Sequence, residues 1–341
     1  MSEHPSAAGE QGIPRLEQGA LRRTLLAWLN VLGPMAGLLA IYALFALIGP
    51  PSFSSTGNLE TIARQTAIVG AAALGMTLIM ILGGIDLSVG SVVALTTVVI
   101  AWLLQHLQAP PALAALGGIA AGAAAGLVSG LVITRLKVVP FIVTLGMMLV
   151  VRGVAKAIAH EQKIDAPLSS LQNLLASLPP EKRLMLVPSG VWLVIALALL
   201  VAGLLKYTRL GRHVFAIGSN EATARLVGIP VNAVKLITYT LGGAFFGLGG
   251  LMLFSRLTVG DPTAAVGLEL DVIAAVVIGG GSLSGGEGSV FGSIVGALIM
   301  SVIRSGCSQM GLDNWVQELV TGIVIVVAVA LDRLRHRAHT E

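Results

Sequence analysis

Residues 67–104 read, in succession, AIVGAAALGMTLIMIL, GGIDLSVGS and VVALTTVVIAWLL. Two apolar runs are thus separated by a glycine pair and a single ionisable side chain, Asp86. Glycine ends helices readily, and a carboxylate after the break can accept hydrogen bonds from backbone N–H groups two or three residues further on, near Ser88. The stretch therefore predicts a helix, a break at Gly83 and Gly84, and a second helix for which Asp86 is the N-cap.

The composition of the whole chain places these helices in a membrane. Of the 341 residues, 55% are hydrophobic and 11% are charged, and the mean hydropathy is +0.89. Such a chain cannot cover the surface of a water-soluble domain. Apolar runs of about 20 residues recur, which is the length that a helix needs to cross roughly 30 Å of hydrocarbon, whereas barrel strands are shorter and alternate. The predicted fold is an all-α, polytopic transmembrane helical bundle.

We predict ten spans within one transmembrane domain, residues 28–332. They cover 28–49, 66–82, 89–106, 111–133, 138–159, 185–205, 233–256, 268–280, 290–306 and 317–332. Lys and Arg gather in cytoplasmic loops, and more than half of the 21 fall there when the N-terminus is placed inside. Both termini are then cytoplasmic. The tail 1–27 does not match a cleavable signal peptide and is expected to stay on the chain, and the second tail is 333–341.

The sequence lacks the motifs of several common binding sites, and this excludes some classes of function. No Gly-Lys dipeptide occurs, so the chain has no P-loop for ATP. The single cysteine, Cys307, and six dispersed histidines offer no cluster of metal ligands. The basic residues are scattered between the spans and form no stripe for nucleic acid. We therefore expect no enzyme activity, no metal and no cofactor in this chain.

The interrupted stretch has a counterpart near the C-terminus. GGIDLSVGSVVAL at 83–95 and GGSLSGGEGSVFGSI at 280–294 both place a glycine pair, Ser and Gly between apolar segments. Corresponding broken helices in two halves of a chain point to a transport site. Asp86 is open to three roles: a cap at a buried turn, a contact to substrate, or part of a gating hinge. The predicted path or hinge residues are Gly83, Gly84, Asp86, Ser88, Thr144, Asp271, Gly280 and Gly281.

Two hydrophilic segments are long enough to matter, 160–184, predicted outside, and 206–232, predicted inside. The inner one contains NEATARLVG at 220–228, which is helical by propensity and follows Gly218 and Ser219. It predicts a short amphipathic helix across the membrane surface, where another protein could bind it.

The chain resembles, over nearly its whole length, the permease subunits of bacterial ABC importers of the ribose/xylose type. The resemblance rests on GMTLIMILGGIDLSVGSVVAL (75–95), PFIVTLGMMLVVRGVA (140–155), GRHVFAIGSNEATARLVGIPV (211–231), ELDVIAAVVIGGGSLSGGEGSVFGSIVGALI (269–299), Trp315 and Gln317. Together these motifs are highly specific, although no single one is.

The resemblance implies a multi-pass permease of the bacterial inner membrane, embedded in membrane lipid and paired with a second permease subunit as a homodimer. It would receive a monosaccharide from a periplasmic binding protein. A separate cytoplasmic ATPase subunit would carry ATP and Mg and dock on the inner segment. The implied coupling residues are Gly211, Arg212, Gly218, Ser219, Asn220, Glu221, Ala222, Ala224, Arg225 and Gly228. Many relatives have a second glycine where this chain has Ser219.

Other classes of protein remain open at this point. An ion-coupled secondary transporter would use an intramembrane carboxylate or a sodium site and no ATPase. A member of the same family could carry a different small solute, such as an amino acid or a signalling furanose. A membrane enzyme ranks third, because no catalytic cluster is present.

Overall fold

The computed structural model describes residues 33–177 and 186–340, with side chains as far as residue 330. The predicted tail 1–27, the start of the first span and part of segment 160–184 lie outside the described residues. The elements in chain order are the helix Gly33–Ile48, η1 (Pro51–Ser54), α2 (Thr56–Ile81), α3 (Val89–His106), α4 (Pro111–Leu136), α5 (Pro140–Ile158), β1 (Ile164–Asp165), η2 (Ser170–Leu174), α6 (Ser189–Tyr207), α7 (Arg209–Ser219), α8 (Glu221–Leu226), α9 (Val231–Leu257), β2 (Val259–Gly260), α10 (Leu268–Ile278), α11 (Val290–Gln309) and α12 (Asn314–Thr340).

Seven helices within the described ranges are long and apolar enough to cross a membrane. They are α2, α3, α4, α5, α6, α9 and α11, and each coincides with a predicted span, although α2 begins ten residues earlier than predicted. The all-α, polytopic fold is therefore confirmed. The first and last predicted spans fall on shorter apolar helices, Gly33–Ile48 and Asn314–Ala330. The count of ten and the cytoplasmic termini stay predictions.

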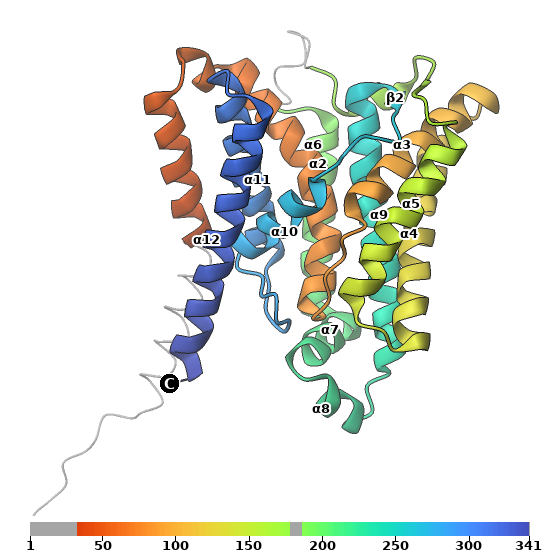
Figure 1. The fold of residues 1–341 in the computed structure, drawn as a ribbon, viewed down its shortest axis with the longest axis vertical. Coiled ribbons are helices and arrows are strands. Elements are labelled where there is room, and N and C mark those ends of the chain that lie inside the picture. Colours follow the sequence, from red (N-terminus) through yellow and green to blue (C-terminus); the bar gives the residue numbers. More distant parts are fainter. Residues whose placement is uncertain (1–32, 178–185, 341) are drawn as a thin grey trace, which may run out of the picture.

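The eighth predicted span, 268–280, falls on α10, which has 11 residues. At 1.5 Å per residue it is about 16 Å long, roughly half of the hydrocarbon thickness. Figure 1 shows α10 in the middle of the bundle, with loops at both of its ends. The helix α12 continues to Thr340, so it includes residues 333–340 of the predicted tail, and residue 341 lies outside the described residues.

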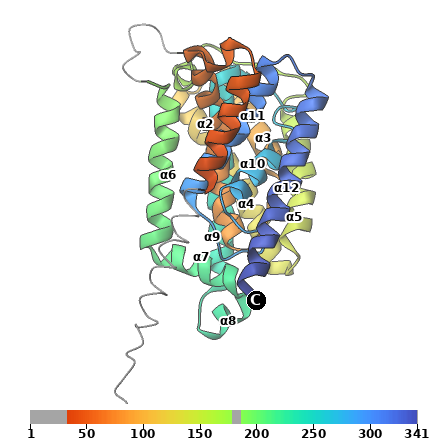
Figure 2. The ribbon, with the colours of Figure 1, turned by 90° about the vertical axis from the view of Figure 1, so that its left-hand side faces the viewer.

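The bundle has a buried centre and an apolar outer surface. Residues 67–81 of α2 are buried, as is most of α3. The helices α5 and α6 lie at the periphery (Figure 2) and expose large apolar side chains such as Leu149 and Leu199. In a chain with this hydropathy such faces suit contact with lipid, because hydrocarbon does not penalise exposed leucine.

Glycine decides the packing of α4 against α9. An added Cβ on Gly122 would lie 2.5 Å from the carbonyl oxygen of Gly243, and one on Gly247 would lie 2.9 Å from the Cα of Ile119. The two backbones are therefore in direct contact, as spacing of small residues by four predicts for helices in a membrane.

The two hydrophilic segments lie at opposite ends of the bundle. Figure 1 shows α7 and α8, which belong to 206–232, at one end and β2 at the other. The strand β1 belongs to 160–184 and pairs antiparallel with β2, Ile164 opposite Gly260. The placement of 160–184 outside and 206–232 inside the membrane stays a prediction.

Candidate translocation cavity and coupling segment

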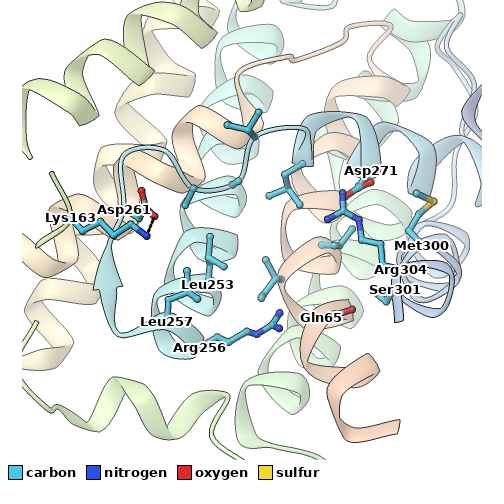
Figure 3. Close-up of a pocket in the computed structure, with 16 residues that line it drawn as sticks. Gln65, Lys163, Leu253, Arg256, Leu257, Asp261, Asp271, Met300, Ser301 and Arg304 are labelled. Carbon is cyan, nitrogen blue, oxygen red and sulfur yellow. Dashed lines mark ion pairs between the residues drawn. The ribbon is translucent and has the colours of Figure 1, made fainter. Parts of the chain in front are cut away.

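A cavity of about 440 Å³ opens between α2, α9, α10 and α11 (Figure 3). Its apolar walls include Val69, Leu253 and Leu268, and its polar lining consists of Gln65, Lys163, Arg256, Asp261, Asp271, Ser301 and Arg304. Lys163 and Asp261 adjoin the β1–β2 pair, so the cavity lies towards the end of the bundle opposite α7 and α8. Its volume falls within the range of roughly 300–1,000 Å³ that is usual for small-molecule sites.

Asp271 of α10 is fully buried and forms an ion pair with Arg304 of α11. A buried carboxylate is costly unless it is paired, so this contact explains how α10 tolerates a charge. The Arg304 side chain is 45% exposed. Arg304, Asp271 and Val266 also line a second cavity, between α10, α11 and α12. The ion pair therefore stands in the wall between two cavities.

A second ion pair joins Lys163 to Asp261 across 3.0 Å at the other side of the cavity. Burial would raise the pKa of Asp261, but hydrogen bonds from Thr263 and Lys163 outweigh it and hold the pKa below its ordinary value. Arg256, on α9, is exposed and has no carboxylate partner among the described residues. Both carboxylates of the cavity are thus already paired, and one guanidinium is free.

The other predicted path residues lie apart from this cavity. The N–H and hydroxyl groups of Ser88 donate to Asp86 at 2.8 and 2.6 Å, so the predicted hydrogen bond is confirmed. The helix α3 has Ser88 as its N-cap, however, and Asp86 stands two residues before it. The prediction that Asp86 is the N-cap was therefore wrong by two residues. Its carboxylate closes a turn that precedes the helix. Thr144 donates to the carbonyl of Ile85 at 3.1 Å and so braces the break from α5.

The helices α2 and α10 end in the same way, which bears out the internal repeat. Gly83 and Gly280 both have φ of +88°. The next glycine in each case, Gly84 or Gly281, donates to the carbonyl five residues earlier, at 2.9 and 2.8 Å. This is the hydrogen-bond pattern of the Schellman motif, in which glycine takes the left-handed position. The glycine pairs therefore end both helices, as predicted.

The two breaks and α7 meet at one junction. The N–H of Gly286, in the second break, donates to the carbonyl of Ile81 at the end of α2, at 2.9 Å. Gly218 of α7 packs on the same carbonyl so closely that an added Cβ would collide with it and lie 2.6 Å from the nitrogen of Gly286. The inner segment is thus in backbone contact with both interrupted helices.

The inner segment contains two helices where the sequence predicts one. The predicted helix in 220–228 exists as α8, and Asn220 caps it by accepting from the N–H of Thr223 at 2.9 Å. The helix α7 was missed. It buries Val214 and Ile217 on one face, but glycines at both ends of RLGRHVFAIG lower its intrinsic propensity. Those glycines are needed where α7 approaches other backbone.

Glu221 ties α8 to α9. Its two carboxylate oxygens accept from Arg225 and from Lys235, each at 2.7 Å. Partial burial would raise the pKa of Glu221, but these two cations outweigh that effect and lower the pKa below its ordinary value. A charge pair of this kind fixes the orientation of a short helix.

The predicted coupling residues divide by exposure. Gly211 and Ala224 are buried within this chain, and Gly218 and Glu221 are half-buried, whereas the exposed ones are Arg212, Ser219, Asn220, Ala222, Arg225 and Gly228. Sequence reasoning missed Leu226 and Val227, which are 88% and 70% exposed at the end of α8. Two adjoining apolar side chains beside a charged turn are the signal that could have found them.

Fold and site together define a membrane permease. Residues 58–329 match the family model described as branched-chain amino acid transport system / permease component, and the chain belongs to that family.

The relatives refine this class. The chain is 38% identical to the ribose import permease protein of Escherichia coli (strain K12) over 306 residues, which is 90% of this chain and 94% of the relative. It is 39% identical to the ribose import permease protein of Bacillus subtilis (strain 168), covering 89% and 92%. It is 34% identical to the fructose import permease protein of Rhizobium meliloti, covering 88% and 84%. No solved structure matches.

Proposed function

We propose that the chain is the transmembrane subunit of an ABC importer of the bacterial inner membrane and that its cargo is a monosaccharide. The cargo is argued from the relatives, two of which are named for ribose import and one for fructose import. A periplasmic binding protein would deliver the sugar at the end that carries β1 and β2. A second copy of the permease would complete the path.

One observation carries the proposal for the energy source. The pair α7 and α8 projects from the end of the bundle opposite the cavity and exposes Leu226 and Val227 there. At an end of the bundle that we place outside the lipid, adjoining exposed apolar side chains are available for contact with another protein. We assign it to the separate ATPase subunit, which would hold ATP and Mg. Through Gly218, movement of α7 would reach both helix breaks.

The predicted path residues keep their assignment as part of this proposal. The hinge consists of the six residues of the two breaks, which are Gly83, Gly84, Asp86, Ser88, Gly280 and Gly281. Thr144 stabilises this hinge, and Asp271 lines the cavity through which the sugar would pass. An ion-coupled transporter is the alternative. Membrane vesicles that lack the ATPase would then still accumulate the sugar, whereas we expect none to be taken up.

The replacement Leu226→Glu tests whether Leu226 and Val227, which we call the docking surface, bind the ATPase subunit. It removes an exposed apolar anchor and adds a charge, so we expect at least a tenfold loss of the ATPase subunit that copurifies with the permease, at unchanged membrane insertion. The matched control is Leu168→Glu, because Leu168 is 89% exposed at the other end. Equal copurification of the ATPase with both variants would contradict the assignment of α8.

A further inference from the structure

The polar lining of the cavity in Figure 3 offers both hydrogen-bond donors and acceptors. Arg256 and Arg304 are exposed and can only donate. Gln65 contributes a buried side-chain oxygen that has no hydrogen-bond partner among the described residues. Ser301 donates to the carbonyl of Ala297 at 2.9 Å, which leaves its oxygen able to accept. A hydroxyl both donates and accepts, so a ligand with several hydroxyls matches this set.

The charges of the cavity disfavour an amino acid. Each carboxylate of the cavity already faces a cation, Asp261 facing Lys163 and Asp271 facing Arg304, so neither offers an uncompensated negative charge to an ammonium group. Neutral hydroxyls do not need such a charge and can share donors that already hold a carboxylate. The apolar residues between the polar ones, such as Val69 and Leu253, suit the C–H faces of a sugar ring.

Arg304 has the position of a direct contact. Its guanidinium carries five N–H donors in a rigid fork, and the ion pair with Asp271 is made through one nitrogen, Nη2. Because Asp271 is fully buried and Arg304 is 45% exposed, the carboxylate orients the guanidinium while the remaining donors face the cavities. Both residues line the second cavity as well, so movement of this one side chain would join the two spaces.

We infer that this cavity is a binding site for the monosaccharide on its way through the permease, with Arg304 as the sugar contact and Asp271 as its positioning residue. The inference rests on the proposed function and adds where the sugar binds. The site is separate from the breaks at Gly83 and Gly280, neither of which lines the cavity.

The test uses the whole transporter, with its ATPase and its binding protein, in proteoliposomes that are offered labelled ribose and labelled fructose. For Arg304→Gln we expect sugar uptake to fall at least tenfold, while ATP hydrolysis stimulated by the sugar-loaded binding protein stays within twofold of the wild type. Arg304→Lys keeps the positive charge but loses the guanidinium fork, so its sugar uptake should lie between that of the wild type and that of Arg304→Gln. The double variant Arg304→Gln with Asp271→Asn should match Arg304→Gln alone, because Asp271 acts through Arg304.

A second measurement does not depend on transport. In a Cys307→Ser background, Leu257→Cys places a thiol in the cavity, where Leu257 is 43% exposed. We expect a saturating concentration of the transported sugar to slow its modification by a thiosulfonate at least threefold. Leu168→Cys, on the segment outside the cavity, is the control and should be modified at the same rate with and without sugar.

The outcomes separate the two proposals. If the wild-type transporter carries neither sugar with ATP, the proposed function fails. If it carries a sugar, the inference is overturned by unchanged uptake in Arg304→Gln, by a parallel loss of uptake and stimulated hydrolysis, or by the absence of protection at position 257. A matched control variant for transport is Arg135→Gln, which removes an exposed guanidinium from the far end of α4 and should leave uptake unchanged.

Discussion

Single glycines set how closely the backbones of this protein approach one another, and Gly218 is the clearest case. It lies in the last turn of α7 against the carbonyl oxygen of Ile81 and the nitrogen of Gly286. Backbone atoms cannot move aside as the end of a flexible side chain can. A residue that looks like a poor choice for a helix is therefore required by its surroundings.

The variant Gly218→Ala should push α7 away from the two breaks. Overpacking of a close contact typically costs about 1–3 kcal/mol, so we expect a lower midpoint of thermal unfolding in detergent and a loss of transport. Gly203→Ala is the control, because an added Cβ there meets nothing within 4 Å. Within α6 alanine should be neutral or stabilise by up to about 1 kcal/mol. Equal melting of the two variants would argue against the contact.

At the scale of elements, α8 depends on charge more than on its length. Six residues are too few to hold a helix by themselves. Asn220 caps its first turn, and Glu221 binds both Arg225 in α8 and Lys235 in α9. Ionised Glu221 therefore contributes to the orientation of α8 against α9.

This dependence predicts an effect of pH. Because the folded state lowers the pKa of Glu221, its contribution is fully present above the ordinary pKa of the unfolded chain and is lost as pH falls through the lower folded value. Hydrogen exchange of the α8 amides, corrected for the intrinsic rate, should accelerate on acidification through that range. Glu221→Gln should remove most of this acceleration, and an identical pH profile in the variant would refute the role of the pair.

The elements also show where sequence reasoning succeeds. The seven long spans follow from apolar runs, because each helix must cover its own length of hydrocarbon. Both glycine breaks follow from local geometry, since a Schellman ending needs only neighbouring residues. The helix α7 could not be predicted in this way. Its glycines, Gly211 and Gly218, are required by contacts with Leu205, Ile81 and the second break rather than by the sequence of α7 itself.

The cavity was the hardest part to foresee. Asp271 was predicted to face the path, and it does line the cavity, but Arg304 holds its carboxylate from another helix 33 residues away. Gln65, Arg256 and Asp261 come from further elements again. No spacing rule links such residues, since only the packing of α2, α9, α10 and α11 brings them together.

At the scale of the whole molecule, the inner segment with α7 and α8 stands at one end of the bundle and β2 at the other (Figure 1). The cavity adjoins β2 through Asp261. That arrangement predicts opposite exposure across the membrane. In a Cys307→Ser background, an impermeant maleimide added to spheroplasts should label Leu168→Cys. It should label Leu226→Cys only after the membrane is opened. The reverse pattern would overturn the assigned topology and, with it, the docking of the ATPase on α8.

The contact of Gly218 with both breaks has one more consequence. Where main chain rests on main chain, no rotamer can yield, and a tightly packed contact transmits a shift of one partner to the other. A displacement of α7 must therefore move the end of α2 and the turn before α11 together. Under the proposed function, an ATPase subunit that displaces α7 would therefore act on both helix breaks at once.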